Sequence, residues 1–579
     1  MQDPELFWMM LNLQTCGIFI LSILIKKILI AAVNSKNIFL ETGTEKFNKR
    51  VSLINVKNLI INKQVLIKKI NPAMKIFKKN KYSNLIMYFV IMIPLSSYAN
   101  SGAIKYSSAG TIPIQVNADP IVDTYPAPEG TEKAPDFTVS VNGKDAFVYD
   151  ILPSVVENTA VIPDMPFSYF GFSGSVKITI TKKNGFSNAV IRPLNDAIKY
   201  TESGNSLIFT LSSPQNLVVE FDGNLKRPLM IFANPREVNI PDKKDQSVVY
   251  WDKGVTDVGN EFVFRSNTTY YVAGGAVVKG SFITLPNSRN VKITGPGILF
   301  NNDTKPHHSL NANKTSSLSI INTIFVNPTH TWTVDIYNGC VDVNLTNVKI
   351  LASYKDGLDI GGVGNGIFDR CFIMSCDDAI ALKATNNTTY GNNNITVQNC
   401  TINQLGGGNS LEIGFEANTG VMNNITFKNI DILHSLLGKT QPPPKYENDW
   451  ATDGVITIHL NNGVHIKNVL YDNIRVEDSN EDFLIALRIW KGPYFNTQNY
   501  GAILGDIDGL TFRHIYFSNS RPLFAPSRGV YSLIKGFDKN HMIKNISFTD
   551  LVIDGKPVMD IAGGKFDVNE FVGDIKFNK

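Results

Sequence analysis

The stretch "LTNVKIL" (residues 345–351) recurs through the C-terminal half of the chain, each time with a polar residue at its centre. The later copies are "FDRCFIM" (368–374), "VQNCTIN" (397–403), "FKNIDIL" (427–433), "YDNIRVE" (471–477), "FRHIYFS" (512–518) and "FTDLVID" (548–554). A single unit is too short to bury its own apolar side, whereas units stacked as coils of a solenoid would bury a continuous interior. We therefore predict a right-handed parallel β-helix over residues 256–579.

The central polar residue of each unit sets the register of the coils. These residues are Asn347, Arg370, Asn399, Asn429, Asn473, His514 and Asp550. Cys371 and Cys400 then occupy an inward position that is aliphatic in the other units. They are either stacked core thiols that act as small hydrophobes or a disulfide, and the aliphatic position favours core thiols.

Residues 108–255 have a different pattern, with short β-like runs such as "DFTVSVNG" and "SVKITITKKNG" separated by Gly- and Asn-rich turns. A spacing near ten residues with such turns is typical of an antiparallel sandwich. We predict a β-sandwich domain here that packs on the next domain or contacts carbohydrate. The whole chain is therefore predicted to be all-β.

The N-terminal region carries a targeting signal. Residues 74–99, "MKIFKKNKYSNLIMYFVIMIPLSSYA", have a basic start, an apolar centre and a small-residue end, which is the layout of a secretory signal peptide. The alternative is an uncleaved anchor, but the apolar run is short for a membrane span. Because a signal peptide begins a chain, residues 1–73 are interpreted as a non-native extension. We expect a secreted or periplasmic protein that leaves the membrane after cleavage.

The charge balance argues against a nucleic-acid partner. The formal net charge is +4, but residues 1–99 hold 14 Lys and Arg against 4 Asp and Glu. The remainder holds 41 basic against 47 acidic residues. A net anionic body without a basic stripe is not typical of a protein that binds phosphate backbones.

Three aspartates stand close together in "DGLDIGGVGNGIFDRCFIMSCDDAIALK" (residues 356–383), namely Asp356 and the adjacent pair Asp377 and Asp378. Asp356 follows the central polar residue of its unit by 9 positions, and Asp378 follows that of the next unit by 8. In a solenoid these positions lie on neighbouring coils, roughly 4.8 Å apart. We therefore expect three carboxyls to converge on one outer face.

Crowded carboxyls of this kind fit acid–base chemistry. Like charges on adjacent rungs repel, and the crowding raises at least one pKa, so that a protonated acid sits beside ionised partners. Glycoside hydrolysis needs that split between an acid and a base. A calcium site or a plain acidic surface are the alternatives; the strand-like context favours hydrolysis, and no metal or cofactor is expected.

The motifs "KDGLDI" and "SCDDAIALK" resemble the Asn-Thr-Asp-Gly and Asp-Asp motifs of polygalacturonases, the family 28 glycoside hydrolases. The order of sandwich and then β-helix is similar to the dextranase and isopullulanase family 49. The resemblance implies inverting hydrolysis of a polysaccharide or oligosaccharide, with the acid at Asp378 or Asp377 and the water held by the others. We expect Asp378 to be the acid.

The remaining motifs of family 28 are altered in this chain. In "GGGNSLEIGFE" Asn409 stands where that family has histidine, and we expect it to bind a sugar hydroxyl. The coil that should carry Arg-Ile-Lys reads "GVITIHL", with His459 near the place, and only the next coil, "LRIWKG", supplies Arg488 and Lys491. These four residues are candidate substrate contacts, but the departures leave the sugar open.

Two aromatic residues complete the candidate site. Trp450 lies in an insertion (residues 437–454) that could wall one end of a groove, and His330 lies one coil before the aspartates. Each is either a sugar contact or a structural residue. Two other functions remain as alternatives to hydrolysis. One is a polysaccharide lyase that uses Arg488 and Lys491, and the other is a non-catalytic carbohydrate-binding solenoid.

Overall fold

The computed structural model describes residues 119–154, 163–301, 307–384, 391–417, 420–437, 453–492, 495, 503–522 and 529–579. The predicted extension (1–73), the predicted signal peptide (74–99) and Trp450 lie outside these ranges. The fold below belongs to residues 115–579, which form a compact unit of their own. None of the described residues forms a helix with the length and hydrophobicity that a membrane crossing requires.

The first domain is a β-sandwich, as predicted. Its strands alternate buried and exposed residues, as in β2, where Phe137, Val139 and Val141 point inward. One sheet is antiparallel and holds β2 (Phe137–Val141), β3 (Lys144–Ala146), β6 (Val176–Lys182), β8 (Tyr200–Ser203) and β9 (Ser206–Leu211). The other holds β1 (Ile121–Thr124), β4 (Val148–Ile151), β5 (Met165–Ser173), β7 (Ala189–Arg192), β10 (Gln215–Phe221) and β11 (Leu229–Pro235), and a 3₁₀ turn η1 (Leu194–Asp196) follows β7.

The sandwich is not purely antiparallel, because β5 and β11 pair in parallel. The parallel solenoid also begins earlier than the predicted boundary at residue 256. Strand β12 (Val248–Trp251) already pairs in parallel with β14 (Thr268–Val272), which makes it the first rung of the solenoid.

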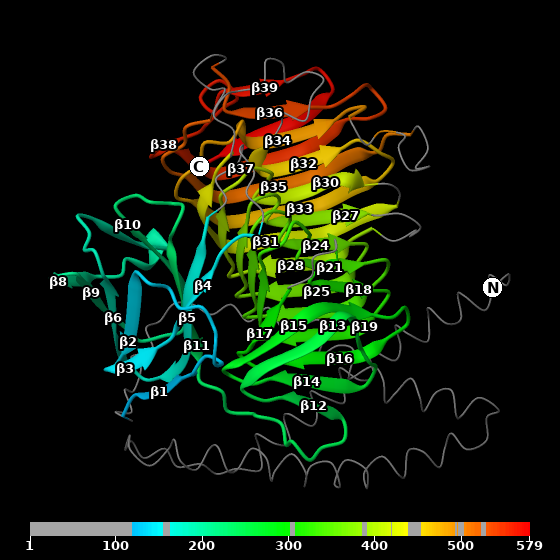
Figure 1. Ribbon diagram of the computed structural model, residues 1–579. Helices are drawn as coiled ribbons and strands as arrows, with labels where there is room; N and C mark the ends of the chain where they lie inside the picture. Colours follow the sequence, from blue (N-terminus) through cyan, green and yellow to red (C-terminus); the bar gives the residue numbers. More distant parts are fainter. Residues whose placement is uncertain are drawn as a thin grey trace, which may run out of the picture. The chain divides into compact units, whose positions relative to one another are not determined.

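The second domain is a parallel β-helix whose strands form three stacks (Figure 1). The first stack is β12, β14, β16 (Arg289–Thr294), β19 (Ser316–Ile321), β22 (Val341–Thr346), β25 (Gly364–Asp369), β28 (Asn393–Gln398), β31 (Val421–Ser435), β33 (His465–Val476), β35 (Asp506–Phe517), β37 (Ile543–Ile553) and β40 (Val572–Asn578). The second stack is β17 (Ile298–Phe300), β20 (Ile324–Asn327), β23 (Lys349–Ala352), β26 (Phe372–Ser375) and β29 (Thr401–Gln404).

The third stack of the β-helix carries the candidate site. It consists of β13 (Gly254–Phe264), β15 (Ala276–Thr284), β18 (Leu310–Asn313), β21 (Val334–Tyr337), β24 (Leu358–Gly361), β27 (Ile380–Ala384), β30 (Leu411–Ala417), β32 (Gly454–Leu460), β34 (Phe483–Ile489), β36 (Ser532–Lys535) and β39 (Phe566–Val568). The short β38 (Lys556–Pro557) folds back against β37.

The central polar residues predicted to set the coil register do so through a backbone corner. All seven have a positive φ of 52–58°, the left-handed conformation that Asn and Asp tolerate better than most residues. Asn429 donates to Asn399 at 2.7 Å, and Asn473 donates to Asn429 at 3.1 Å, so successive corners are bonded along the solenoid. The predicted register is confirmed.

The cysteines follow from the same register. Cys371 and Cys400 are buried in the continuous core of the solenoid, next to Val348 and Ile430 at the equivalent positions. They are free thiols, which agrees with the core-thiol interpretation and not with the disulfide.

The sandwich packs on the second stack of the β-helix. The interface joins aromatic and aliphatic side chains from both domains, including Phe167 and Phe232 from the sandwich and Phe372 and Leu433 from the β-helix. At its edge, Arg192 in β7 bonds to Glu220 at 2.8 Å and to Glu477 of the β-helix at 2.6 Å. His434 in β31 also bonds to Glu220, at 2.6 Å. Because these groups are buried and paired, the domains are held in a defined geometry.

Candidate active site

The predicted aspartates lie in the turns that lead from the second strand stack to the third. Strands β21, β24, β27 and β30 are in register, and the residues two positions before Val334, Leu358, Ile380 and Leu411 form one row. That row is Trp332, Asp356, Asp378 and Asn409. Backbone bonds from Gly357 to Asp378 at 2.9 Å and from Ala379 to Asn409 at 2.8 Å continue the pairing through it. Asp356 and Asp378 are therefore on neighbouring rungs, as their spacing predicts.

Asp356 is a buried carboxylate that is held by two donors. Its side chain accepts a hydrogen bond from Trp332 Nε1 at 3.0 Å and one from Lys383 Nζ at 2.9 Å, both on Oδ2. Only 4% of the residue is exposed. A cation and an N–H group thus hold one oxygen of Asp356 in a fixed orientation.

A second buried carboxyl lies beside Asp356. Asp359 Oδ1 is 3.1 Å from the same Lys383 Nζ, and the residue is 1% exposed. Burial, with Asp356 as a nearby negative charge, raises the pKa of Asp359 well above its usual range. Lys383 Nζ is also 3.6 Å from Glu416, so one ammonium group is shared by three carboxyl side chains.

Asp377 is the accessible acid of the three. Its side chain is 38% exposed, and Lys355 Nζ lies 3.7 Å from its Oδ2. Partial removal of the carboxyl from water raises the pKa of Asp377 to about 7. The nearby carboxyl of Asp356 contributes to this rise, and the positive charge of Lys355 opposes it. Because water reaches this carboxyl, screening by solvent moderates the rise. Asp377 thus keeps its proton to a higher pH than a free aspartate does, and its exposed surface can reach a bound molecule.

Asp378 is buried behind Asp377 and oriented by Asn409. Its Oδ1 accepts the backbone N–H of Asn409 at 2.8 Å and the side-chain amide of Asn409 at 2.7 Å. Burial, Asp356 and Asp377 raise the pKa of Asp378, whereas the two N–H donors favour its ionised form. The three carboxyls therefore cannot all ionise independently.

A glycine permits this close approach of two turns. Gly408 has a φ of +70°, and a Cβ atom at this position would lie 2.6 Å from Oδ1 of Asp377. The "GGG" stretch (residues 406–408) thus lets the turn that carries Asn409 come against the Asp377–Asp378 turn.

Aromatic side chains flank the aspartates on the N-terminal side. Trp332 keeps 37% of its surface exposed while its Nε1 holds Asp356. The ring of His330 stacks on Tyr354 with centroids 3.6 Å apart, and Lys355 Nζ lies 5.1 Å above the Tyr354 ring and 5.7 Å from that of Trp332. Exposed aromatic faces beside polar groups are suited to sugar rings, which present both C–H and hydroxyl groups.

Two of the other predicted contacts, His459 and Asn409, are buried. His459 has no exposed surface; it bonds to Glu412 at 2.9 Å and stacks on Phe415, so it offers no surface to a substrate. Asn409 is also buried, and its amide oxygen accepts the N–H of Gly454 at 2.9 Å, so its side chain serves Asp378 and not a sugar hydroxyl.

Arg488 and Lys491 lie on later rungs. Arg488 pairs in register with His459, is largely buried, and lies over the ring of Trp490 at 4.7 Å. Lys491 is exposed, with its Nζ 5.2 Å from the ring of Phe495. A substrate contact by either residue stays a prediction.

Sequence reasoning missed Lys383, Asp359, Lys355 and Tyr354. Lys383 ends the stretch of residues 356–383 that contains all three aspartates. Its outward position on the rung next to Asp356 could have predicted a contact with that carboxyl. In the part of the chain that the structure describes, no group of three or more His, Cys, Asp or Glu residues is arranged to hold a metal ion.

Comparison with known proteins gives matches among solved structures only. No family model and no curated protein matches the chain. Dex49A from Penicillium minioluteum is 15% identical with a TM-score of 0.46, over 79% of this chain and 96% of its own. The catalytic unit of a thermostable GH87 α-1,3-glucanase from Streptomyces thermodiastaticus strain HF3-3 is 13% identical with a TM-score of 0.36, over 79% and 86%.

A Family 28 exopolygalacturonase from Yersinia enterocolitica is 11% identical with a TM-score of 0.34, over 79% of this chain and 96% of its own. Since the identities and TM-scores are low, the chemistry of the site rests on the chain's own residues.

Proposed function

We propose that the protein is a secreted glycoside hydrolase that cleaves a polysaccharide with inversion, using Asp356, Asp377 and Asp378. The observation that carries this proposal is the convergence of three carboxyls in different environments. Asp356 accepts hydrogen bonds from Lys383 and Trp332, Asp378 accepts two from Asn409, and Asp377 is an exposed acid with a pKa raised to about 7. Hydrolysis of a glycosidic bond requires such a pair, a proton donor and an ionised base.

The environments suggest a role for each aspartate. Asp377 is the general acid, because it holds its proton near neutral pH and has exposed surface from which to reach a glycosidic oxygen. Asp356 and Asp378 hold the attacking water, with Asp356 taking its proton. This differs from the expectation that Asp378 is the acid; Asp378 is largely buried and its Oδ1 already accepts two N–H groups.

In the proposed reaction, Asp377 donates its proton to the leaving oxygen as the bond to the anomeric carbon breaks. Water attacks that carbon from the opposite face and passes a proton to Asp356. Trp332, Tyr354 and His330 provide faces on which the sugar units next to the scissile bond can stack.

The test is a screen of the mature protein on dextran, pullulan, polygalacturonate and algal galactans, with reducing ends as the readout. We expect one polymer to be cleaved without an increase in ultraviolet absorbance. An unsaturated, ultraviolet-absorbing product would identify a lyase instead. Tight binding of a polymer without new reducing ends would identify a carbohydrate-binding solenoid. Asp377→Asn should abolish cleavage while the circular dichroism spectrum stays unchanged.

A further inference from the structure

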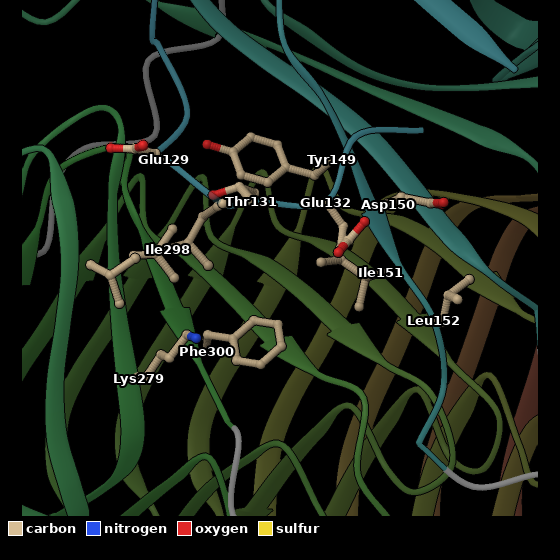
Figure 2. A pocket seen from close by; sticks show the side chains of 13 residues that line it. Glu129, Thr131, Glu132, Tyr149, Asp150, Ile151, Leu152, Lys279, Ile298 and Phe300 are labelled. Atoms are coloured by element: carbon tan, nitrogen blue, oxygen red, sulfur yellow. The ribbon is translucent and has the colours of Figure 1, made fainter. Parts of the chain in front are cut away.

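A pocket of ≈ 260 Å³ lies between the sandwich and the β-helix, away from the aspartates. Figure 2 shows Glu132 and Ile151 of the sandwich on one side, and Lys279 and Phe300 of the β-helix on the other. The floor is apolar, with Val277 and Ile298 completing it, whereas the carboxylate of Glu132 and the amine of Lys279 supply hydrogen-bonding groups.

This mixture of surfaces fits one sugar ring. A pyranose presents C–H groups on its faces and hydroxyls around its edge, so it binds where apolar or aromatic side chains meet a few polar groups. Pockets for drug-sized ligands usually measure about 300–1,000 Å³, so this pocket is suited to a smaller unit. A carboxylate and an ammonium group can accept from and donate to hydroxyls.

The pocket is in line with the candidate active site. Phe300 pairs in register with Val326, Val326 with Leu351, and Leu351 with Met374, which precedes Asp377 by three residues. The pocket wall is thus three rungs, or roughly 14 Å, from the coil of the acid. Val326, Leu351 and Met374 are buried under the sandwich, so this row gives the separation along the axis of the solenoid.

The sandwich wall of the pocket also contacts the turn that follows β20. Ser154, which follows the pocket residues Ile151 and Leu152, donates its backbone N–H at 2.8 Å and its hydroxyl at 2.6 Å to Pro328 O. Pro328 begins the turn that carries His330 and Trp332. The sandwich therefore contacts the turn whose exposed residues His330 and Trp332 lie beside the aspartates.

We propose that this pocket is a distant subsite, which binds one sugar unit of the same polysaccharide chain that the aspartates cleave. The sandwich then contributes directly to substrate binding by forming one wall of this pocket. This inference rests on the proposed function, because it assumes that the aspartates cleave a glycan chain.

The experiment compares oligosaccharides of two to eight units, prepared from whichever polymer of the screen the wild-type protein cleaves. The variants Lys279→Ala and Glu132→Ala remove one polar group each from the pocket. Lys292→Ala is the matched control, since Lys292 is an exposed lysine on the neighbouring strand β16, outside the pocket. kcat/KM is measured for each length.

For the wild type, kcat/KM should rise once an oligosaccharide is long enough to reach the pocket. Lys279→Ala and Glu132→Ala should reduce kcat/KM about tenfold for the long oligosaccharides and leave it unchanged for the short ones, as expected for the loss of one hydrogen bond to a charged group. Lys292→Ala should behave as the wild type at every length. In the inactive Asp377→Asn background, titration calorimetry with the longest oligosaccharide should show the same tenfold loss for Glu132→Ala.

Two results would overturn the subsite and leave the hydrolase intact. In the first, kcat/KM of both pocket variants depends on oligosaccharide length as it does in the wild type. In the second, kcat/KM falls equally at all lengths, which would indicate a general effect on folding. If no polymer is cleaved by the wild type, the proposed function fails, and the subsite fails with it.

Discussion

Asn409 donates its backbone N–H and its side-chain amide to the same carboxylate oxygen of Asp378, at 2.8 Å and 2.7 Å. The side-chain oxygen of Asn409 is held in turn by the N–H of Gly454 at 2.9 Å. A chain of bonds thus runs across three rungs and fixes the orientation of Asp378. Asn409 is a positioning residue, because it acts through Asp378 and has almost no exposed surface of its own.

Asn409→Ala should therefore reduce kcat without raising KM. It removes one bond to a carboxylate, a loss of about 1.5–3 kcal/mol, which corresponds to roughly a 10- to 100-fold lower rate if the bond is needed in the transition state. The lost donor also raises the pKa of Asp378, so the acidic limb of the kcat–pH profile should move to higher pH. Asn423→Ala, at an asparagine of the first stack that accepts from Asn468, is the control. An unchanged pH profile would contradict the positioning role.

Asp356 and Asp359 offer a matched pair, because both carboxyls lie within 3.1 Å of Lys383 Nζ. Asp356→Asn should reduce kcat by about 10²–10⁴, the usual contribution of a general base. Asp359→Asn should keep most of the activity, since Asp359 is 1% exposed and offers almost no surface to a substrate, and burial raises its pKa, which favours the neutral form that Asn mimics. Steady-state kinetics on the cleaved polymer tests both variants. Equal losses would show that Asp359 belongs to the catalytic group.

The pH dependence should report Asp377. A general acid works in its protonated form, so activity should be present below its pKa and decline as the pH rises through it, at or somewhat below pH 7 given the exposure of the side chain. Lys355 opposes the rise in the pKa of Asp377, so Lys355→Met should move this alkaline limb to higher pH. Lys314→Met, at a lysine in another turn of the solenoid, should leave the limb in place. A limb that moves to lower pH in Lys355→Met would contradict the assignment of the acid.

The coil register could be predicted from the sequence because two independent signals agree on it. The apolar positions repeat, and each unit contains a residue, usually Asn, at the corner where the backbone adopts a positive φ. Register then placed Asp356 and Asp378 on neighbouring rungs without knowledge of any side-chain contact.

Side-chain directions could not be predicted in the same way. Asn409 was placed on the correct rung, but its amide turns to Asp378 because the glycine-rich turn before it approaches the turn that carries Asp377 and Asp378. His459 was expected near a sugar and instead pairs with Glu412. Its side chain points out of the solenoid, but residues of the next coil, such as Trp490, pack against it. Lys383 was missed because a lysine in a strand is more often solvated than buried among acids.

The junction between the two domains should make stability depend on pH. Burial alone would lower the pKa of His434, but its bonds to Asp478 and Glu220 more than offset burial and raise it. Burial would raise the pKa of Glu220, but His434 and Arg192 lower it. The stabilisation from His434 is thus complete below its unfolded pKa of about 6.5 and declines as the pH rises through its folded pKa. The stabilisation from Glu220 is present above the unfolded pKa of Glu220, about 4.5, and declines as the pH falls through its folded pKa.

His434→Gln should accordingly lower Tm most between about pH 4.5 and 6.5, with a smaller difference from the wild type at pH 9. Calorimetric scans across this range measure it. His465→Gln is the control, because His465 is an exposed histidine whose pair with Asp506 lies on the surface. If the difference in Tm between His434→Gln and the wild type grew with pH, His434 would be buried in its neutral form.

The stereochemistry of the first product tests the roles of the aspartates independently of their location. If Asp377 gives its proton to the leaving oxygen while Asp356 activates a water, the two carboxyls must leave room for that water, at about 6.5–9.5 Å instead of the roughly 5–5.5 Å of a retaining enzyme. Neighbouring rungs are only about 4.8 Å apart, so the two side chains must diverge. The structure provides a cause: Lys383 and Trp332 draw Asp356 toward one side, whereas Asp377 lies at the exposed surface beside Lys355. Proton NMR of the early reaction, before mutarotation, should show the inverted anomer. A retained anomer would require a covalent aspartyl intermediate, and Asp356 would then be the nucleophile instead of the base that activates water.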